Sequence, residues 1–384
     1  MKFPWTFASL LSVVSALPAY ESVTYEDEPH TPSSLAAEPT SERQNTSFPS
    51  QPAEGQLFAS ARPALHGKWG AIVFGEFLYW TAKEEGLNYG TQSTYNTRPP
   101  FQNFSDPYKG PRGKIVDISP HYHAGYRLGF DLFLPHDGWD VLGRYTQYRN
   151  VAHSSIEQKA LNIVWPIFLV NNGIPKSLSA KAKWELDYSV LDLELGRSFF
   201  LGRHLSVRPF FGFRAAWIEQ TLKATFKDVV FFPFPPVMVP SLSMNNHNDF
   251  QGYGMRTGVQ TKWPLGWGFS LLGDLGASLL WSKFHIAQFD KNANHTPRSH
   301  ISDHLREVTP VLDLFGGMAW EIGISQQKFY LRFHGGWEQQ VWFYQNQLNI
   351  FLGNSVSGAE VGNVKNMRGN LTLAGWTAGA QFGF

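Results

Sequence analysis

The chain has 384 residues and a net charge of +1, so its overall charge gives no reason to expect nucleic-acid binding. It has no cysteine, which excludes disulfides, thiol catalysis and cysteine-based metal sites. Aromatic residues make up 15% of the chain, yet the sequence lacks the run of about 20 apolar residues that a transmembrane helix needs. Many aromatics, 35 glycines and no long apolar run are typical of transmembrane β-strands, although a large soluble β-protein has a similar composition.

The first segment, residues 1–19, has the layout of a secretory signal peptide. One basic residue precedes an apolar stretch that ends in small residues at Ala16 and Ala19. An uncleaved anchor is the alternative. Residues 20–67 are rich in Pro, Ser, Thr and Glu and hold few side chains that could form a core, so we expect a disordered periplasmic arm. The folded domain is then expected at residues 68–384.

Apolar and polar side chains alternate through this domain with a period of two, which indicates β-strands. In the segment 117–134 the alternation is longer than the five or six residues of a typical soluble strand, at about a dozen. A tilted strand that crosses a bilayer explains this length. We expect ten such segments, at residues 71–87, 117–134, 139–151, 184–200, 205–220, 253–263, 268–284, 307–321, 329–343 and 370–384.

The connections between these segments alternate between short and long. Short turns on one side and long loops on the other are typical of outer-membrane barrels. We therefore predict an all-β fold, a transmembrane antiparallel β-barrel of about 10 strands with short periplasmic turns and long extracellular loops. The last segment, 370–384, should close the barrel against residues 71–81. Two apolar stretches, 159–171 and 228–241, could hold another hairpin and raise the count to twelve.

One irregularity and one terminal residue also carry predictions. The alternation changes phase between Tyr188 and Leu191, for which we expect a β-bulge. The chain ends on an aromatic residue, Phe384, on the apolar face of the last strand. Phe384 resembles the terminal aromatic residue that outer-membrane barrels present to their assembly machinery, so we predict that it acts as an assembly signal.

Charged side chains on the polar faces of these strands should point into the barrel. On a lipid-facing position, an Arg or Lys near the bilayer midplane would cost about 2–4 kcal/mol. Both signs are mixed, so a pore would be weakly ion-selective. A ten-stranded barrel is little wider than one of about eight strands, which side chains fill, so a filled barrel remains the alternative. The residues predicted to line the lumen are Glu76, Asp117, His121, His123, Arg127, Asp131, Arg144, Asp192, Glu194, Arg208, Arg214, Arg256, Lys262, Asp274, Asp313, Arg332 and Glu338.

Seven ordered blocks between Trp69 and Phe384 resemble one protein family. They are GEFLYWTAKEEGLNY, LPHDGWDVLGRYTQY, LDLELGRSFFLGRHLSVRPFFGFRAAWIEQ, GWGFSLLGDLGASLLW, PVLDLFGGMAWE, HGGWEQQVWFYQNQL and LTLAGWTAGAQFGF. The chain is thereby similar to the Legionella-type pore-forming major outer membrane proteins, also found in environmental chlamydia-like bacteria. The resemblance implies an outer-membrane barrel with a porin-like role in passive diffusion of small solutes. Relatives commonly use cysteines for envelope cross-linking, which this chain lacks.

Two other functions remain open. Exposed apolar loops would suit a structural or adhesive envelope protein that contacts a host or neighbouring barrels. His121 and His123 share a strand face and could bind a metal or act as bases in an outer-membrane hydrolase, but no ordered Ser/His/Asp pattern accompanies them. The remaining histidines of interest are expected to be solvent-exposed loop residues: His285, His295, His300 and His304.

The prediction for location is the bacterial cell outer membrane. We expect no catalytic residue, metal or other cofactor. The expected partners are outer-membrane lipid, the barrel assembly machinery and small solutes, with a homo-oligomer left open and no nucleic acid.

Overall fold

The computed structural model describes most of the domain beyond residue 69. The described residues are 70–93, 113–135, 138–156, 163–166, 174–202, 204–232, 237–292, 297–324, 328–356, 359–366 and 368–384. The predicted signal peptide, 1–19, and the predicted arm, 20–67, lie outside them. The described residues all fall within one compact unit, Gln51–Phe384.

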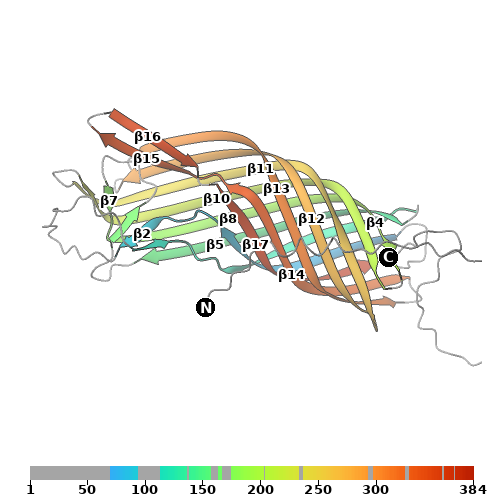
Figure 1. Cartoon of the computed structure of the whole chain (residues 1–384). Helices are drawn as coiled ribbons and strands as arrows, with labels where there is room; N and C mark the ends of the chain where they lie inside the picture. The colour runs from blue at the N-terminus through green and yellow to red at the C-terminus, as the bar shows by residue number, and fades with distance from the viewer. Residues whose placement is uncertain are drawn as a thin grey trace, which may run out of the picture. The chain divides into compact units, whose positions relative to one another are not determined.

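Ten antiparallel strands close into a barrel (Figure 1), which confirms the predicted fold. Each strand pairs with the next around the ring, and β17 returns to β1. In order around the barrel they are β1 (Gly70–Glu84), β4 (Tyr122–Phe133), β5 (Trp139–Ile156), β8 (Ser179–Arg197), β10 (Ser206–Phe232), β11 (Val237–Gly266), β12 (Phe269–Asn292), β13 (Pro297–Ile324), β14 (Phe329–Asn346) and β17 (Gly369–Gly383). The described part of the chain contains no helix with the length and apolarity needed to span a membrane.

The barrel closes where the sequence predicts. β17 pairs with β1 from Ile72 opposite Gly383 to Glu84 opposite Leu371. At the chain end, the amides of Phe384 and Ala71 each donate to the other's carbonyl, at 2.9 and 3.0 Å. Closure matters because no water is available in the hydrocarbon core to satisfy an open edge.

Most of the smaller strands lie at the extracellular end, which is the end away from the C-terminus in Figure 1, whereas β9 lies at the other end beside the first residues of β10. β2 (Gly90–Ser93) pairs with β3 (Gly113–Val116) and with β6 (Ile163–Pro166), and β15 (Asn349–Val356) forms a hairpin with β16 (Ala359–Asn366). Two very short strands pair with β10 outside the ring, β7 (Ile174–Lys176) and β9 (Phe199–Phe200). These additions leave the ring at ten strands.

Four strands continue far beyond the length that a bilayer requires. β10, β11, β12 and β13 have 27, 30, 24 and 28 residues, whereas a tilted transmembrane strand needs about 9–11. The apolar stretch 228–241 lies largely in β10 and β11, which pair with each other up to Phe231 opposite Val237. It therefore lengthens existing strands and adds no hairpin to the ring.

The predicted β-bulge in β8 is wrong, and a change of polarity explains the pattern. β8 pairs with β5 and β10 without a register shift through residues 188–191. Its inward side chains change from apolar, ending at Val190, to acidic at Asp192, while its outward side chains change from Asp187 to Leu191. Inside and outside exchange polarity at the membrane boundary, so the alternation changes phase although the backbone stays regular.

The same exchange holds around the ring. Exposed apolar side chains cover the periplasmic half of the barrel wall, and the outer edge of this apolar belt carries aromatic residues suited to the lipid interface. Towards the extracellular end, the interior is instead a core of apolar side chains. Its largest members, each at most 1% exposed, include Trp80, Trp184, Tyr188, Phe250, Phe284 and Trp342.

Gly254 is needed because β11 passes very close to β12. A Cβ at Gly254 would lie 2.0 Å from the carbonyl oxygen of Leu279, and backbone cannot move aside as a side chain can. Gly254→Ala should therefore destabilise the barrel by about 1–3 kcal/mol, as overpacking does. Gly316→Ala is the matched control because a Cβ there meets nothing within 4 Å. The measurement is the temperature at which the compact, fast-migrating gel band disappears; equal temperatures for both variants would contradict the prediction.

The terminal aromatic should matter for assembly. Phe384 is exposed to the lipid side and contacts Phe382, with ring centroids 6.1 Å apart. We expect deletion of Phe384 to lower the fraction of folded protein in the outer membrane, measured by heat-modifiable gel mobility of membrane fractions. Phe329→Ala is the control, since Phe329 also stacks on Phe382 but is not the terminal residue of the sequence. Normal membrane levels without Phe384 would refute its role as an assembly signal.

Candidate functional site: the ion-pair layer in the lumen

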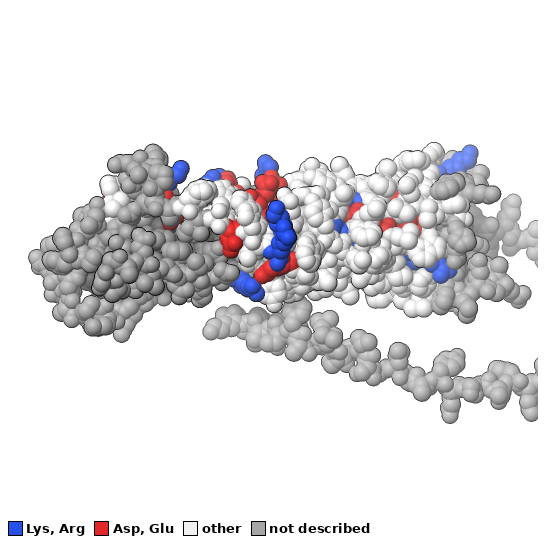
Figure 2. Space-filling model, turned by 90° about the horizontal axis from the view of Figure 1, so that it is seen from above, with Lys and Arg blue, Asp and Glu red and all other residues white. Residues whose placement is uncertain are grey.

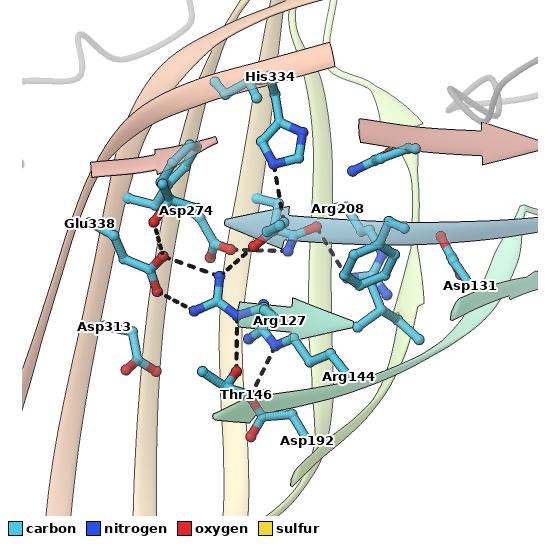
Figure 3. A pocket seen from close by; sticks show the side chains of 18 of the residues that line it. Arg127, Asp131, Arg144, Thr146, Asp192, Arg208, Asp274, Asp313, His334 and Glu338 are labelled. Atoms are coloured by element: carbon cyan, nitrogen blue, oxygen red, sulfur yellow. Dashed lines mark hydrogen bonds and ion pairs between the residues drawn. The ribbon is translucent and has the colours of Figure 1, made fainter. Parts of the chain in front are cut away.

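Charged side chains from many strands meet inside the membrane-embedded half of the barrel. They surround a cavity of about 220 Å³ (Figure 3). The lining includes most of the residues that the sequence predicts for the lumen: Glu76, Arg127, Asp131, Arg144, Asp192, Arg208, Arg214, Arg256, Lys262, Asp274, Asp313, Arg332 and Glu338. Alternation alone brings them together, because in an antiparallel barrel every second residue of each strand points inward.

Arg127 of β4 links three strands. Its guanidinium donates to Glu76 of β1 at 2.7 Å and to both carboxylate oxygens of Glu338 of β14, at 2.7 and 3.1 Å. It also donates to the Thr146 hydroxyl at 2.9 Å. His334 lies 3.0 Å from the other oxygen of Glu76. This guanidinium therefore has acceptors on several sides and is buried without a free charge.

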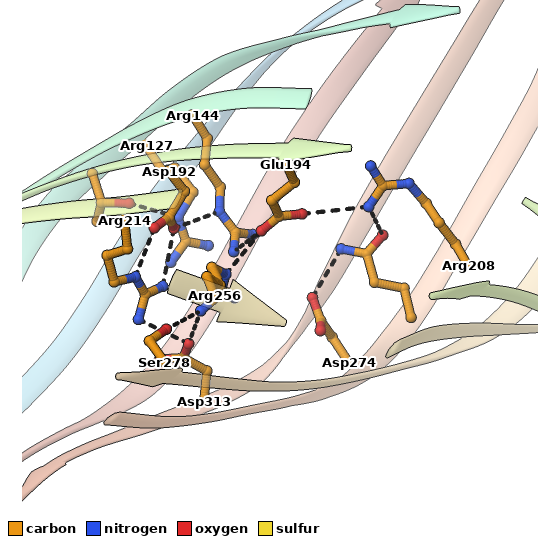
Figure 4. Close-up of polar contacts among 12 residues, drawn as sticks. Arg127, Arg144, Asp192, Glu194, Arg208, Arg214, Arg256, Asp274, Ser278 and Asp313 are labelled. Carbon is orange, nitrogen blue, oxygen red and sulfur yellow. Dashed lines mark hydrogen bonds and ion pairs between the residues drawn. The ribbon is translucent and has the colours of Figure 1, made fainter. Parts of the chain in front are cut away.

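A second cluster joins β5, β8, β10, β11 and β13 (Figure 4). Asp192 of β8 accepts from Arg144 at 3.0 Å and from Arg214 at 2.6 Å. Arg256 pairs with Asp313, which also accepts from Arg214 at 2.9 Å. The alternation of arginines and carboxylates thus crosses the lumen from wall to wall.

Glu194 connects this cluster to a third one near the periplasmic turns. Glu194 accepts from Arg144 and Arg256, each at 2.9 Å, and lies 3.4 Å from Arg208. Arg208 also pairs with Asp140 of β5. It contacts Gln260 at 3.2 Å, and the Gln260 amide donates to Asp274 at 3.0 Å. The network therefore continues along the barrel axis as well as across it.

Breaking one member of such a network is costly because the remaining charge stays buried. A buried ion pair as a whole adds little net stability, since desolvation offsets the attraction. Removing one partner typically costs about 3–5 kcal/mol. The ion-pair layer therefore favours one relative position of the strands, since any other position would leave a buried charge without its partner.

The apolar core begins directly above this layer. The Arg127 guanidinium lies over the Trp80 ring at 5.5 Å, and that of Arg214 lies over Trp342 at 5.8 Å. Tyr188 bridges the two regions: its hydroxyl donates to Gln340 at 2.7 Å and its ring packs edge-on against Trp342. Guanidinium groups stacked on aromatic faces join the charged and apolar regions without an intervening gap.

Three of the predicted lumen residues lie apart from both the cavity and the ion-pair network. Asp117 is exposed outside the strands, where its carboxylate accepts from the Ile118 amide at 2.8 Å. His121 is exposed just before β4 begins. His123 faces inward at the extracellular end of β4 and contacts the Val151 carbonyl oxygen at 3.1 Å. The predicted second strand included residues 117–121, but β4 begins only at Tyr122, so alternation does not apply to Asp117 and His121.

Two charged residues of the lumen, Asp140 and Glu321, are missing from the sequence prediction. Asp140 pairs with Arg208, and Glu321 binds Lys262 at 2.5 Å and the Tyr330 hydroxyl. Both follow from alternation, since Asp140 is in phase with Arg144 and Glu321 with Asp313. They lie at strand ends, where a sequence pattern defines a face least well.

The described histidines and carboxylates form no metal centre: within the described ranges, no three of them come together in a way that could hold an ion. His285 and His304 belong to β12 and β13 rather than to a loop, and their rings stack at 4.6 Å on the outer wall. His300 stacks on Phe289. His295 lies outside the described residues.

Comparison with known proteins identifies the family. Residues 62–384 match the sequence profile described as the Legionella pneumophila major outer membrane protein precursor. The chain belongs to this family. The resemblance of the seven sequence blocks is thereby confirmed, and with it the location in the bacterial outer membrane. No curated protein matches the chain.

Solved structures with some likeness to the chain are also outer-membrane proteins. The outer membrane protease OmpT of Escherichia coli is 10% identical, with 86% of this chain and 99% of that chain covered and a TM-score of 0.35. A FadL homologue of Pseudomonas aeruginosa is 9% identical, with 83% and 90% covered and a TM-score of 0.25. Similarities this low carry no information about activity.

The network gives a direct test of its own role. Arg256 is buried and is shared between Glu194 and Asp313. Arg256→Met keeps much of the side-chain volume but removes the charge, so we expect a loss of about 3 kcal/mol in the free energy of unfolding, the typical cost of breaking a buried pair. Denaturant titration of the folded barrel in detergent micelles measures it.

Arg149→Met is the control for this variant. Arg149 pairs with Asp187 on the exposed outer wall, where solvent screens the pair, so its loss should leave the denaturation midpoint unchanged. Equal midpoints for both variants would show that the lumen pairs have no structural role.

Proposed function

We propose that this protein is a filled outer-membrane barrel with a structural role in the envelope, one of the two alternatives that the sequence leaves open. The observation that carries the proposal is the continuity of the lumen contents. Ion pairs cross the barrel from Asp192 to Asp313 through Arg214, and bulky side chains such as Trp80 and Trp342 pack directly on the charged layer.

The extracellular extension supports the same proposal. β10 to β13 carry the barrel wall well beyond the apolar belt, and there the interior is an apolar core while the outer surface is polar. Such a part has the layering of a soluble β-barrel. It is suited to hold a rigid surface outside the membrane, where contacts with neighbouring barrels or a host would be made. The apolar loops that motivated an adhesive role are residues 163–170 and 229–240, and most of their side chains lie outside the described residues.

A porin-like channel is the second candidate, favoured by one specific observation. The cavity has a volume of about 220 Å³, is lined by charges of both signs and has room for several water molecules. Opened at both ends, such a lumen would pass small solutes with weak ion selectivity. Passage would require the ion pairs and the aromatic core above them to separate.

Conductance separates the two proposals. The folded protein, verified by heat-modifiable mobility, is inserted into planar lipid bilayers and the current is recorded over a range of voltages. A filled barrel should give no steady single-channel steps, since no continuous water path crosses the aromatic core. Reproducible steps that scale with salt concentration would refute the filled barrel and support the porin-like channel.

A further inference from the structure

Two cations stand side by side on the outer wall without a counter-charge. Lys283 of β12 and Arg306 of β13 are directly opposite each other in the strand register, and both side chains are exposed. Neither forms an ion pair with any residue in the described ranges of the chain. Like charges directly opposite on neighbouring strands repel each other and destabilise the pairing, so this arrangement needs an explanation.

Elsewhere on the outer wall, several charges of opposite sign are paired. Arg149 pairs with Asp187, Lys183 with Glu185, and Arg368 with Glu307 at 2.8 Å. Lys181 and Lys227 are also exposed without an ion pair in the described ranges, but they lie opposite Thr225 and Ser179, whereas Lys283 and Arg306 lie opposite each other.

The carboxylates around the cation pair have other contacts. Asp249 on β11 lies beside His285, with its Oδ2 at 3.6 Å from Nδ1 of that histidine. Asp303 accepts from the His304 amide at 2.7 Å, and Glu307 binds Arg368. No carboxylate in the described ranges therefore forms an ion pair with either cation.

Their height on the wall indicates what those surroundings are. Lys283 and Arg306 lie two residues along their strands from Trp281 and Val308, which are 67% and 47% exposed and belong to the apolar belt. Tryptophan prefers the boundary between lipid tails and head groups. On the face shown in Figure 2, the charged residues gather in a band next to a broad, mostly uncharged stretch. The two cations are therefore at the level of the lipid head groups.

We infer that Lys283 and Arg306 form a binding site for the phosphate groups of the glycolipids in the outer leaflet of the outer membrane. A guanidinium offers two parallel N–H donors to phosphate oxygens, and the neighbouring ammonium adds a compact charge. The stacked rings of His285 and His304 occupy the next outward row and add hydrogen-bonding groups above the phosphate. A phosphate between the two cations replaces their repulsion with attraction. This site is independent of whether the lumen conducts.

Binding of a defined lipid tests the site. The full folded chain in detergent is titrated with bisphosphorylated lipid A, and bound copies are counted by native mass spectrometry. Parallel titrations use dephosphorylated lipid A and inorganic phosphate. The wild type should prefer the phosphorylated lipid, and Lys283→Gln/Arg306→Gln should weaken its binding by about 25-fold, since each basic side chain near an anionic surface contributes about fivefold.

A matched variant controls for net charge. Lys181→Gln/Lys227→Gln also removes two positive charges from the outer wall, but Lys181 lies ten residues along its strand from the belt residue Leu191, and Lys227 lies fourteen residues from the belt residue Phe213. It should bind as the wild type does, and both variants should keep heat-modifiable mobility. Equal loss in both variants, or no preference for the phosphorylated lipid, would overturn the site. Inorganic phosphate bound as tightly as the lipid would overturn the assignment to a lipid head group.

Discussion

Each strand of this barrel must serve two environments along its length. Where it crosses the membrane, the outward side chains meet lipid, so polar groups such as Asp192 and Arg214 are placed inside. Further out, water surrounds the wall, so apolar side chains such as Trp184 turn inward and form a core. Because the backbone alternates without interruption, only the residue types change at the boundary. The rest of the architecture depends on this inversion of polarity.

This inversion explains why the interior of the barrel has a charged layer in its membrane-embedded half and an apolar core in its extracellular half. Charges excluded from lipid must find partners inside, and the arginines and carboxylates of the ion-pair layer meet that need across the whole barrel width. Above them, apolar side chains form a core, among which buried polar residues such as Gln220 and Asn248 are also enclosed. The charged layer and the apolar core contact each other where Arg127 lies over the Trp80 ring and Arg214 lies over the Trp342 ring. A guanidinium is attracted to the face of an aromatic ring, so these contacts are favourable. The proposed filling of the lumen would follow from a long wall and a narrow ring.

The outer wall shows the same boundary from the other side. The aromatic residues at the edge of the belt, among them Trp281, mark where lipid tails end. Lys283 and Arg306 follow at once, at the level where anionic head groups begin. The barrel is therefore held at a fixed depth by apolar contacts below this level and by charge above it.

The sequence by itself determined the architecture. A period of two, repeated in ten segments with short and long connections in turn, is enough to specify a closed barrel, its closing pair of strands and the faces that carry Glu76, Arg127 and Arg256, because side-chain direction in a strand depends only on parity. The family was also readable from the ordered blocks. The alternation of side-chain direction does not indicate at which residue a strand begins or which of the inward charged side chains form ion pairs. The late start of β4, which leaves Asp117 and His121 outside it, depended on tertiary structure.

The same is true of the regular backbone at residues 188–191 and the ion pairs that join strands far apart in the chain, such as Arg127 and Glu338. The tertiary structure alone also showed that the extracellular half is packed with apolar side chains. The physical reason is that the ion pairs and the apolar core depend on the radius of the barrel and on where the membrane ends along its wall. Neither quantity can be read from the sequence of a single strand.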